Sequence, residues 1–482
     1  MKMLTRNTLQ LSLTKFFSFL CLCISIVSNA QEFEWVYGLK DVDIDHDPGI
    51  SFNDRAHISS VITKDEYIYM IGSQSGVHDF GDGQPNFVEG DVGLPSDFII
   101  KMDQNKNVIW VKQWRNLNIN GLRQIIKVGF DSLGNILFIG HMINYGTQVT
   151  LDPDFHPVLN PNITHPTLST DIAYDFIIKL DENGNYINSR VFENLGFSDF
   201  TIDNNGDIVM AGYHTVRYNI ITDPAYQYPQ RNIKAFITKL DNNFNTVWEK
   251  TFEKLHEDAY AGFRAVGTDS QNNIYCIGTY RNGFVFDNLT FEDTEGEFLC
   301  KLYPNGDEVW IVGMENTTLL DVPLNGAPNN YRELEIDAAD NLYFFSEYSH
   351  NIICHFNNIT LTDLPEVDFM GFPTQEAVVF KTDSDGNHLW HAPIYGLGDQ
   401  SVVNFCLNNL GQPLLVVKSQ NDIHYSYDDV LLGDMQQKSF LLKLNAQGGL
   451  VDFKRLDFLP TRIHTDVDSN PLGVIILAKY ID

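Results

Sequence analysis

The hydrophobic and polar positions of this chain follow a pattern that returns along most of its length. An apolar run with a lysine, ending in Asp and a turn, reads "FIIKMDQNKN" from Phe98, "FIIKLDENGN" from Phe176 and "FITKLDNNFN" from Phe236. Two short β-rich runs around an Asp, Asn or Gly turn are typical of a β-hairpin. The lysine of this phrase occurs six times, at Lys101, Lys179, Lys239, Lys301, Lys381 and Lys443.

A second hairpin phrase lies between the copies of the first, as in "IKVGFDSLGNILFIG" and "DFTIDNNGDIVMAG". Its turn residue occurs seven times, at Lys64, Asp131, Asp203, Asp269, Asp337, Asn408 and Asp468, with a spacing of 60–72 residues. Helical periodicity is absent after residue 30, so the pattern predicts an all-β chain.

Repeated four-stranded units predict a β-propeller, because one small sheet cannot bury both faces alone. We assign strands a and b of each blade to the second phrase and strands c and d to the lysine phrase. Six blades are then complete, and a seventh is split between the termini. Ile463–Tyr480 supplies its strands a and b, and Phe33–Leu39 supplies its strand d. The sequence therefore predicts a seven-bladed propeller of four-stranded antiparallel blades, closed by joining Phe33–Leu39 to Val474–Lys479, within a single domain, 31–482.

Several residues repeat with the blades and are predicted to be structural. A tryptophan stands nine residues after four of the lysines, at Trp110, Trp248, Trp310 and Trp390, and Trp35 resembles a further copy without its lysine phrase. These tryptophans are expected at equivalent sites between blades. The repeated aspartates are expected to accept backbone N–H bonds in turns, and the lysine stems to cover apolar surface.

The phrases "DFIIKLDENGN", "DSLGNILFIGH" and "DNNGDIVMAGY" resemble the bacterial secreted β-propeller repeat, whose pattern is "D-A-F-V-x-K-L-D-x-x-G-x-x-x-W" followed by "D-x-x-G-N-V-Y-V-T-G". The resemblance covers nearly all of residues 31–482 and implies the propeller fold. It also implies a secreted or surface protein of the kind exported as type IX secretion cargo. Such cargo usually ends in a separate sorting domain, whereas this sequence ends at Tyr480-Ile481-Asp482, inside the last repeat.

Residues 1–30 have the pattern of a secretory signal peptide: a basic start, an apolar run from Phe16 to Val27, and Ser28-Asn29-Ala30 before the expected cleavage point. The alternative is a single membrane anchor, but the apolar run is shorter than the roughly 20 residues of a spanning helix. We expect an exported protein, periplasmic, surface-bound or secreted, without a transmembrane segment after cleavage.

Charge and cysteine content narrow the function further. A formal net charge of −31 disfavours binding to nucleic acid and to anionic lipid. Four cysteines remain after residue 30, too few for a disulfide scaffold in so long a chain, and we expect buried free thiols. Cys276 and Cys300 form the one pair that a disulfide could join.

Function is expected where the repeat varies, in the long b–c connections at 141–175, 213–235 and 347–377. Several blades also carry a small extra hairpin in this connection, such as "FVFDNLTFED" and "CHFNNITLTD". Aromatic rings beside amides and carboxylates suit sugar or peptide ligands, although tyrosines can also simply pack long loops. The candidate ligand-binding residues are His141, Asn144, Tyr145, Tyr213, His214, Arg217 and Tyr218.

Two metal hypotheses arise from the same end of the blades. The stretch "DVDIDHDPG" sets carboxylates at alternate positions, which suits weakly held Ca²⁺, but an ordinary solvated acidic loop explains it too. The candidate calcium ligands are Asp41, Asp43, Asp45 and Asp47. Histidines that follow strand b could also converge on a transition metal; they are His78, His141, His214, His350 and His424.

These patterns favour a non-catalytic exported propeller that binds a glycan or protein partner through the face formed by the b–c and d–a connections. The alternative is a propeller-type lyase or hydrolase with its site at the mouth of the central axis. An enzyme should bring His, Asp, Glu or Arg side chains of several blades together there. No serine-hydrolase, zinc-protease or paired-cysteine motif supports that alternative.

Overall fold

The structure is a computed structural model, in which the chain divides into two units, Met1–Gly38 and Leu39–Asp482. Every described residue belongs to the second unit, so the predicted leader, 1–30, lies outside the described residues. The structure describes residues 40–41, 55–75, 78–79, 85–86, 96–103, 105, 107–114, 121–144, 172–193, 195–214, 233–253, 255–256, 259–286, 289–291, 295–317, 334–362, 374–396, 398–419, 423–425, 430–433, 438–456, 466–469 and 475–478. Within these ranges, no helix is long and apolar enough to cross a membrane.

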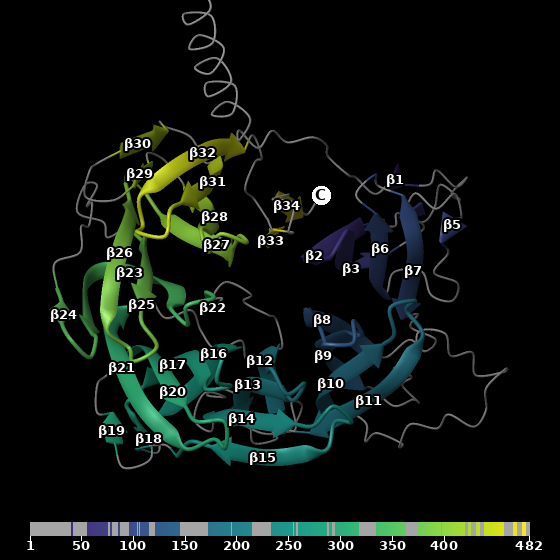
Figure 1. Cartoon of the computed structure of the whole chain (residues 1–482), viewed down its shortest axis with the longest axis horizontal. Coiled ribbons are helices and arrows are strands. Elements are labelled where there is room, and N and C mark those ends of the chain that lie inside the picture. Colours follow the sequence, from purple (N-terminus) through teal and green to yellow (C-terminus); the bar gives the residue numbers. More distant parts are fainter. Residues whose placement is uncertain are drawn as a thin grey trace, which may run out of the picture. The chain divides into compact units, whose positions relative to one another are not determined.

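The described residues form six four-stranded antiparallel blades, each with strands a to d in chain order (Figure 1). Blade 1 contains β2 (Arg55–Lys64), β3 (Tyr67–Ser75), β6 (Ser96–Asp103) and β7 (Val108–Trp114). Blade 2 contains β8 (Gly121–Phe130), β9 (Ile136–Asn144), β10 (Ile172–Leu180) and β11 (Tyr186–Glu193). Blade 3 contains β12 (Leu195–Ile202), β13 (Ile208–His214), β14 (Lys234–Leu240) and β15 (Thr246–Thr251).

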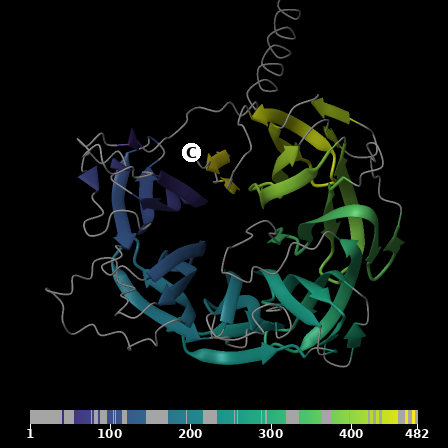
Figure 2. The same ribbon diagram turned by 180° about the vertical axis from the view of Figure 1, so that it is seen from behind.

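The second half of the chain repeats this order. Blade 4 contains β16 (Tyr260–Thr268), β17 (Ile274–Arg281), β20 (Glu295–Leu302) and β21 (Glu308–Thr317). Blade 5 contains β22 (Glu335–Ile336), β23 (Leu342–His355), β25 (Glu376–Thr382) and β26 (His388–Tyr395). Blade 6 contains β27 (Gln400–Leu407), β28 (Pro413–Ser419), β31 (Lys438–Leu444) and β32 (Leu450–Leu456). The first strands lie on the inner side of this unit and the fourth strands on its outer side (Figures 1 and 2).

The prediction of seven four-stranded blades is wrong for the described chain, which has six. The last hairpin, β33 (Asp466–Ser469) and β34 (Ile475–Ala478), is a two-stranded sheet that contacts β27 of blade 6 and β2 of blade 1. The seventh blade needed strands from both ends of the chain, and the described residues supply only this hairpin. Phe33–Leu39 lies outside the described residues, so closure by joining the terminal strands stays a prediction.

The hydrophobic core lies between neighbouring blades. One cluster joins Tyr69 and Ile99 of blade 1 to Phe138 of blade 2. Four further clusters join blades 2 and 3, 3 and 4, 4 and 5, and 5 and 6 in the same way. Each central strand is thereby buried on both faces, which explains why strands b and c are almost continuous apolar runs. All four cysteines of this region are buried free thiols, with Cys276 directly opposite Cys300 on paired strands.

The register predicted for the tryptophans is confirmed. Trp110, Trp248, Trp310 and Trp390 all lie on strand d, each directly opposite the repeated lysine of strand c. Each ring packs against a glycine in the c–d turn of the next blade, where φ is positive. An added Cβ on Gly448 would lie 2.8 Å from the Trp390 ring, so this contact requires glycine.

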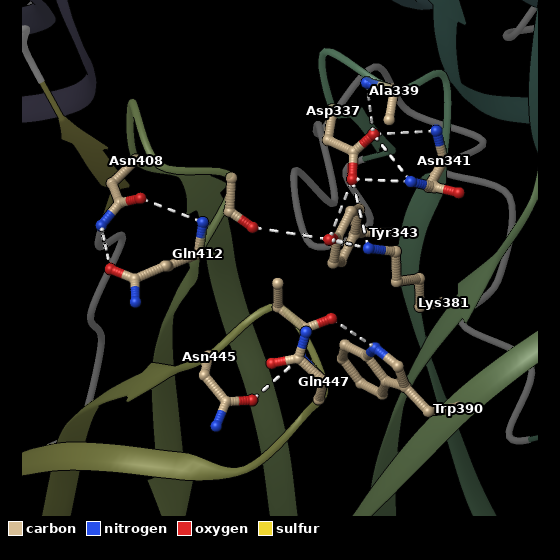
Figure 3. Close-up of polar contacts among 12 residues, drawn as sticks. Asp337, Ala339, Asn341, Tyr343, Lys381, Trp390, Asn408, Gln412, Asn445 and Gln447 are labelled. Atoms are coloured by element: carbon tan, nitrogen blue, oxygen red, sulfur yellow. Dashed lines mark hydrogen bonds and ion pairs between the residues drawn. The ribbon is translucent and has the colours of Figure 1, made fainter.

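The repeated aspartates and lysines join turns to strands and blades to one another. Asp337 accepts the N–H groups of Ala339 and Asn341 in its own turn, as predicted (Figure 3). Lys381 is buried and donates to Asp337 Oδ2 at 3.2 Å. Trp390 Nε1 donates to Ala446 O of blade 6 at 2.9 Å (Figure 3). The lysines therefore do more than cover apolar surface, because their charged ends fix the turns.

The extra hairpins of the b–c connections pair with the preceding blade, and we call them straps. The strap of blade 5, residues 351–361, pairs with β21 of blade 4. The strap of blade 6, β29 (Ile423–Tyr425) with β30 (Val430–Gly433), pairs with β26 of blade 5. The strap of blade 4, β18 (Phe284–Phe286) with β19 (Leu289–Phe291), bonds to Glu253 O after β15. Straps thus cover outer edge strands that would otherwise expose unpaired backbone groups.

The first blade has a related hairpin, β4 (His78–Asp79) with β5 (Pro85–Asn86), which pairs with β1 (Lys40–Asp41). In blades 3 to 5 the strap bonds to the residue five positions after the strand-d tryptophan: Glu253, Glu315 and Tyr395. Lys40 lies five residues after Trp35 and pairs with Asp79 in the same way. β1 therefore takes the place of the end of a strand d.

Candidate functional site

The structure places three of the predicted ligand-binding residues with their side chains. His141 lies near the end of β9, and Tyr213 and His214 end β13. The backbone of Asn144 ends β9. Tyr145, Arg217 and Tyr218 lie outside the described residues. The described candidates therefore come from the strand-b ends of two neighbouring blades.

His141 is held by a buried carboxylate that sequence reasoning missed. Its Nδ1 lies 2.8 Å from Asp175 Oδ1, on the adjacent strand β10. The other carboxylate oxygen accepts the Phe197 N–H of blade 3 at 2.7 Å. The Asp175 side chain is 1% exposed and that of His141 is 16% exposed. Asp175 thus ties the imidazole to two blades at once.

Asp175 lies in a polar environment to which three blades contribute. Burial raises the pKa of Asp175, and the hydrogen bond from His141 acts in the opposite direction. Burial also raises the pKa of the Tyr213 phenol in blade 3, and the nearby Asp175 charge adds to that rise. The Arg264 guanidinium of blade 4 lowers the same pKa. Tyr213 therefore stays protonated at neutral pH.

Tyr213 owes its position to small neighbours in blade 3. Its ring lies over Gly196 of β12, where an added Cβ would be 2.2 Å from Tyr213 Cζ. On β14 it pairs with Ala235, which also leaves room. The side chain is buried, which gives it a packing role in addition to its nearness to Asp175.

His214 does not join this group. Side chains of consecutive strand residues point to opposite faces of a sheet, so His214 faces away from Tyr213. Its ring packs against Phe236, with centroids 6.3 Å apart. The predicted cluster of candidate side chains therefore divides, with His141 and Tyr213 near Asp175 and His214 elsewhere.

The position of His141 varies from blade to blade, although its neighbours repeat. Each equivalent residue lies one position after the end of the shared strand-b pattern, opposite strand c. We call these six positions the b–c row: Ser73, His141, Tyr213, Thr279, Glu347 and Lys418. Six different polar or aromatic residue types occupy one structural position. The a–b and c–d turns at the other end of the blades instead repeat the same Asp, Lys, Trp and Gly.

The inner strands carry charge, but the charges neutralise one another. Lys127 Nζ of blade 2 lies 2.5 Å from Asp199 Oδ1 of blade 3. Asp199 Oδ2 also accepts the Val266 N–H of blade 4 at 2.8 Å. The Asp199 side chain is buried, so its carboxylate contacts the inner strands of blades 2 and 4 and not the solvent. This arrangement stabilises the packing of blades and resembles the Asp175 bridge more than an open catalytic funnel.

Exposed large apolar side chains lie toward the other end of the blades. Leu133 and Leu410 occupy a–b turns, and Tyr303 a c–d turn. Ile109 and Val247 immediately precede strand-d tryptophans of two blades. These residues belong to separate blades, and scattered exposed apolar residues are normal on a protein surface.

The predicted calcium ligands are largely untested. Asp41 lies in β1, where its backbone pairs with His78, and Asp43, Asp45 and Asp47 lie outside the described residues. Where side chains are described, no three His, Cys, Asp or Glu residues gather as a metal site. His141 binds Asp175 through Nδ1. His424, in the strap of blade 6, stacks on Tyr395 at the end of β26 in blade 5. These two imidazoles therefore do not converge.

No protein-family model matches the chain, and no curated protein matches it. The resemblance to the secreted propeller repeat therefore remains a prediction. Solved structures similar to the chain include a protein of unknown function from Dyadobacter fermentans, at 12% identity and TM-score 0.36, covering 84% of this chain and 99% of that one. A protein of unknown function from Bacteroides caccae has 10% identity and TM-score 0.33, covering 74% and 90%. The polysaccharide lyase Uly1 has 10% identity and TM-score 0.34, covering 88% and 91%. Similarity at this level defines no function.

Proposed function

We propose that this chain is an exported, non-catalytic β-propeller that binds a glycan or protein partner through the face of its b–c and d–a connections. The observation that carries the proposal is the b–c row. One structural position holds six different side chains there, whereas the turns at the other end repeat nearly unchanged. A position that only stabilised the blade would be expected to repeat with it.

The rigidity of this end supports binding. Asp175 joins blades 2 and 3 opposite His141 on the paired strands β9 and β10, and Asp199 joins blades 2, 3 and 4. A ligand site on a rigid scaffold loses less conformational entropy on binding. Export is inferred from the leader-like sequence of residues 1–30.

The test is a binding screen of residues 31–482 against arrayed glycans and against proteins from the surface of the source cell. Lys418→Ala should change the binding, because Lys418 belongs to the b–c row. Leu410→Ser, in an a–b turn at the opposite end of blade 6, serves as the matched control. Binding that Leu410→Ser removes and Lys418→Ala leaves intact would place the ligand on the other face and contradict the proposal.

A propeller-type lyase or hydrolase is the second candidate, and the His141–Asp175 pair is the observation that favours it. A buried carboxylate that orients an imidazole is also how many enzymes prepare a general base. Incubation with soluble polysaccharides separates the two proposals. Chain shortening that His141→Gln abolishes would establish the enzyme, and intact polysaccharide that remains bound would support the binding protein.

A further inference from the structure

We propose that His141 is the hydrogen-bond acceptor for a hydroxyl group of a neutral glycan, with Asp175 as its positioning residue. This inference rests on the proposed binding function and specifies its ligand. Three features carry it: the fixed ring, the direction of its remaining nitrogen, and the charge of the surroundings.

The ring is fixed because both oxygens of Asp175 are occupied. Oδ1 lies 2.8 Å from His141 Nδ1 and Oδ2 lies 2.7 Å from Phe197 N. A carboxylate with its second oxygen bound to a neighbouring blade cannot turn away from the imidazole. The orientation of His141 is therefore set by the packing of blades 2 and 3 and exists before any ligand binds.

The hydrogen bond to Asp175 also decides which ring nitrogen faces the ligand. Burial raises the pKa of Asp175, but the hydrogen bonds from His141 and from the Phe197 N–H favour its ionised form. An ionised carboxylate only accepts hydrogen bonds, so in this form Nδ1 carries the proton and Nε2 keeps its lone pair. Nε2 makes no hydrogen bond to any residue that the structure describes, and the side chain is partly exposed. The result is an oriented acceptor on β9, three residues before that strand ends at Asn144.

The charges around His141 determine which kind of ligand group can donate a hydrogen bond to its Nε2. An imidazole whose Nε2 keeps its lone pair, backed by a carboxylate, offers an acceptor to a hydroxyl group and repels an anion. Blade 3 adds the protonated Tyr213, whose phenol is close enough to Asp175 and to Arg264 of blade 4 for both charges to act on its pKa. The chain carries a formal net charge of −31, which further disfavours uronic acid or sulfated ligands. Neutral sugars supply many hydroxyl donors without charge.

The experiment uses residues 31–482 and two matched panels: neutral gluco-, manno-, xylo- and galacto-oligosaccharides, and oligosaccharides that contain uronic acid. We expect binding in the neutral panel, and at least tenfold weaker binding by His141→Leu. The control is His355→Leu. His355 is an exposed histidine on the strap of blade 5 that pairs with Glu315 of blade 4. This variant should bind the oligosaccharides like the unchanged protein.

Nitrogen-15 NMR of the unchanged protein tests the same point without relying on a variant that may misfold. We expect His141 as the Nδ1–H form, with an Nε2 signal that shifts when the bound neutral oligosaccharide is added. In Asp175→Asn the proton should move toward Nε2, because the amide can donate to Nδ1.

The outcomes separate this inference from the function on which it rests. Neutral glycan binding that is unchanged in His141→Leu, with no shift of Nε2, overturns the role of His141 and leaves a glycan-binding propeller. Binding only in the uronic acid panel overturns the neutral ligand. Absence of binding in both panels overturns this inference and the glycan branch of the proposed function together.

Discussion

The outer edges of blades 3 to 5 and the b–c row of blades 2 and 3 begin from the same connection between strands b and c. On the outer edges, this connection folds back as a strap and pairs with strand d of the preceding blade. In blade 2, His141 lies on β9 shortly before this connection; its ring is fixed by Asp175, and its Nε2 makes no hydrogen bond to a described residue. The b–c end of a blade therefore provides edge protection in one region and an oriented polar group in another.

The difference shows how a propeller can vary without losing its fold. Straps add backbone hydrogen bonds and buried apolar contacts, so their removal should cost stability. The His141–Asp175 pair adds a directed polar group on a rigid support, so altering His141 should affect the ligand more than the fold, whereas altering Asp175 should affect both. Four substitutions or conditions test this comparison, in order of decreasing effect.

The largest expected effect comes from the buried side of a strap. Ile352 of the blade 5 strap is fully buried in the cluster between blades 4 and 5. Ile352→Ala should lower the free energy of unfolding by about 3 kcal/mol, because it removes apolar contacts and leaves a cavity. Ile359→Ala is the matched control, since Ile359 is 44% exposed on the same strap. Urea unfolding that gives equal, small changes for both variants would show that the strap does not stabilise the blades.

The second effect concerns the support of the b–c row. Asp175→Ala should cost about 2 kcal/mol, because the N–H of Phe197 and Nδ1 of His141 both lose their acceptor in a buried site. Asp452→Ala, on the exposed strand β32, should leave the free energy of unfolding unchanged. Chemical denaturation measures both, and a neutral Asp175→Ala would mean that the carboxylate does not join blades 2 and 3.

The third effect compares a turn that touches a strap with one that does not. Gly386 has φ +75°, and an added Cβ would lie 2.9 Å from Asn357 of the blade 5 strap and 3.2 Å from Trp310. Gly386→Ala should cost about 2 kcal/mol through backbone strain and displaced neighbours. Gly411→Ala has φ +66° with no atom closer than 3.7 Å, so strain alone should cost about 1 kcal/mol. Thermal unfolding in which Gly411→Ala is the worse variant would contradict the contact with the strap.

The smallest effect is a pH dependence on the strapped side. His388 Nε2 lies 2.9 Å from His391 Nδ1, and the Phe356 ring of the strap packs on His388. Burial, and then His388, lowers the pKa of His391 to about 4. In the unfolded chain, His391 takes up a proton below about pH 6.5, whereas in the folded chain it does so only below about pH 4. The free energy of unfolding should therefore fall as the pH drops from about 6.5 to about 4.

His391→Phe should therefore lose less stability than the unchanged protein between pH 7 and pH 5. Urea unfolding at the two pH values measures the difference. Parallel losses in both proteins would assign the acid sensitivity to groups other than this pair.

The repeat by itself determined much of the fold. The lysine phrase and its partner phrase fixed four strands per blade, and the spacing from Lys239 to Trp248 fixed their register, because cross-strand pairs around a tight turn are local. Extra hairpins could also be recognised as apolar runs around a turn. Six complete blades followed from the repeat, but the seventh could not be derived, since it depended on pairing residues from the two ends of the chain.

The candidate site was predicted only in part. His141 and Tyr213 stood out because they follow strand b where the repeat ends. Asp175 did not stand out as a site residue. It immediately precedes the repeated aromatic residue of the lysine phrase, and Asp97 occupies the same position before Phe98. Its partners are on different strands and on a different blade, so no local spacing reveals them. The separation of His214 from this group followed from the alternation of side chains along β13.

The sequence by itself determined the local structure of this protein: strands, turns, the tryptophan register and the exclusion of helices from the repeats. Each of these depends on residues a few positions apart, so a pattern along the chain contains the whole cause. Only the tertiary structure decided which blade each strap covers, which carboxylate holds His141, and that Lys127 and Asp199 neutralise each other. Those contacts join residues 29 to 72 positions apart, where burial and distance choose one partner among many of the same chemical type.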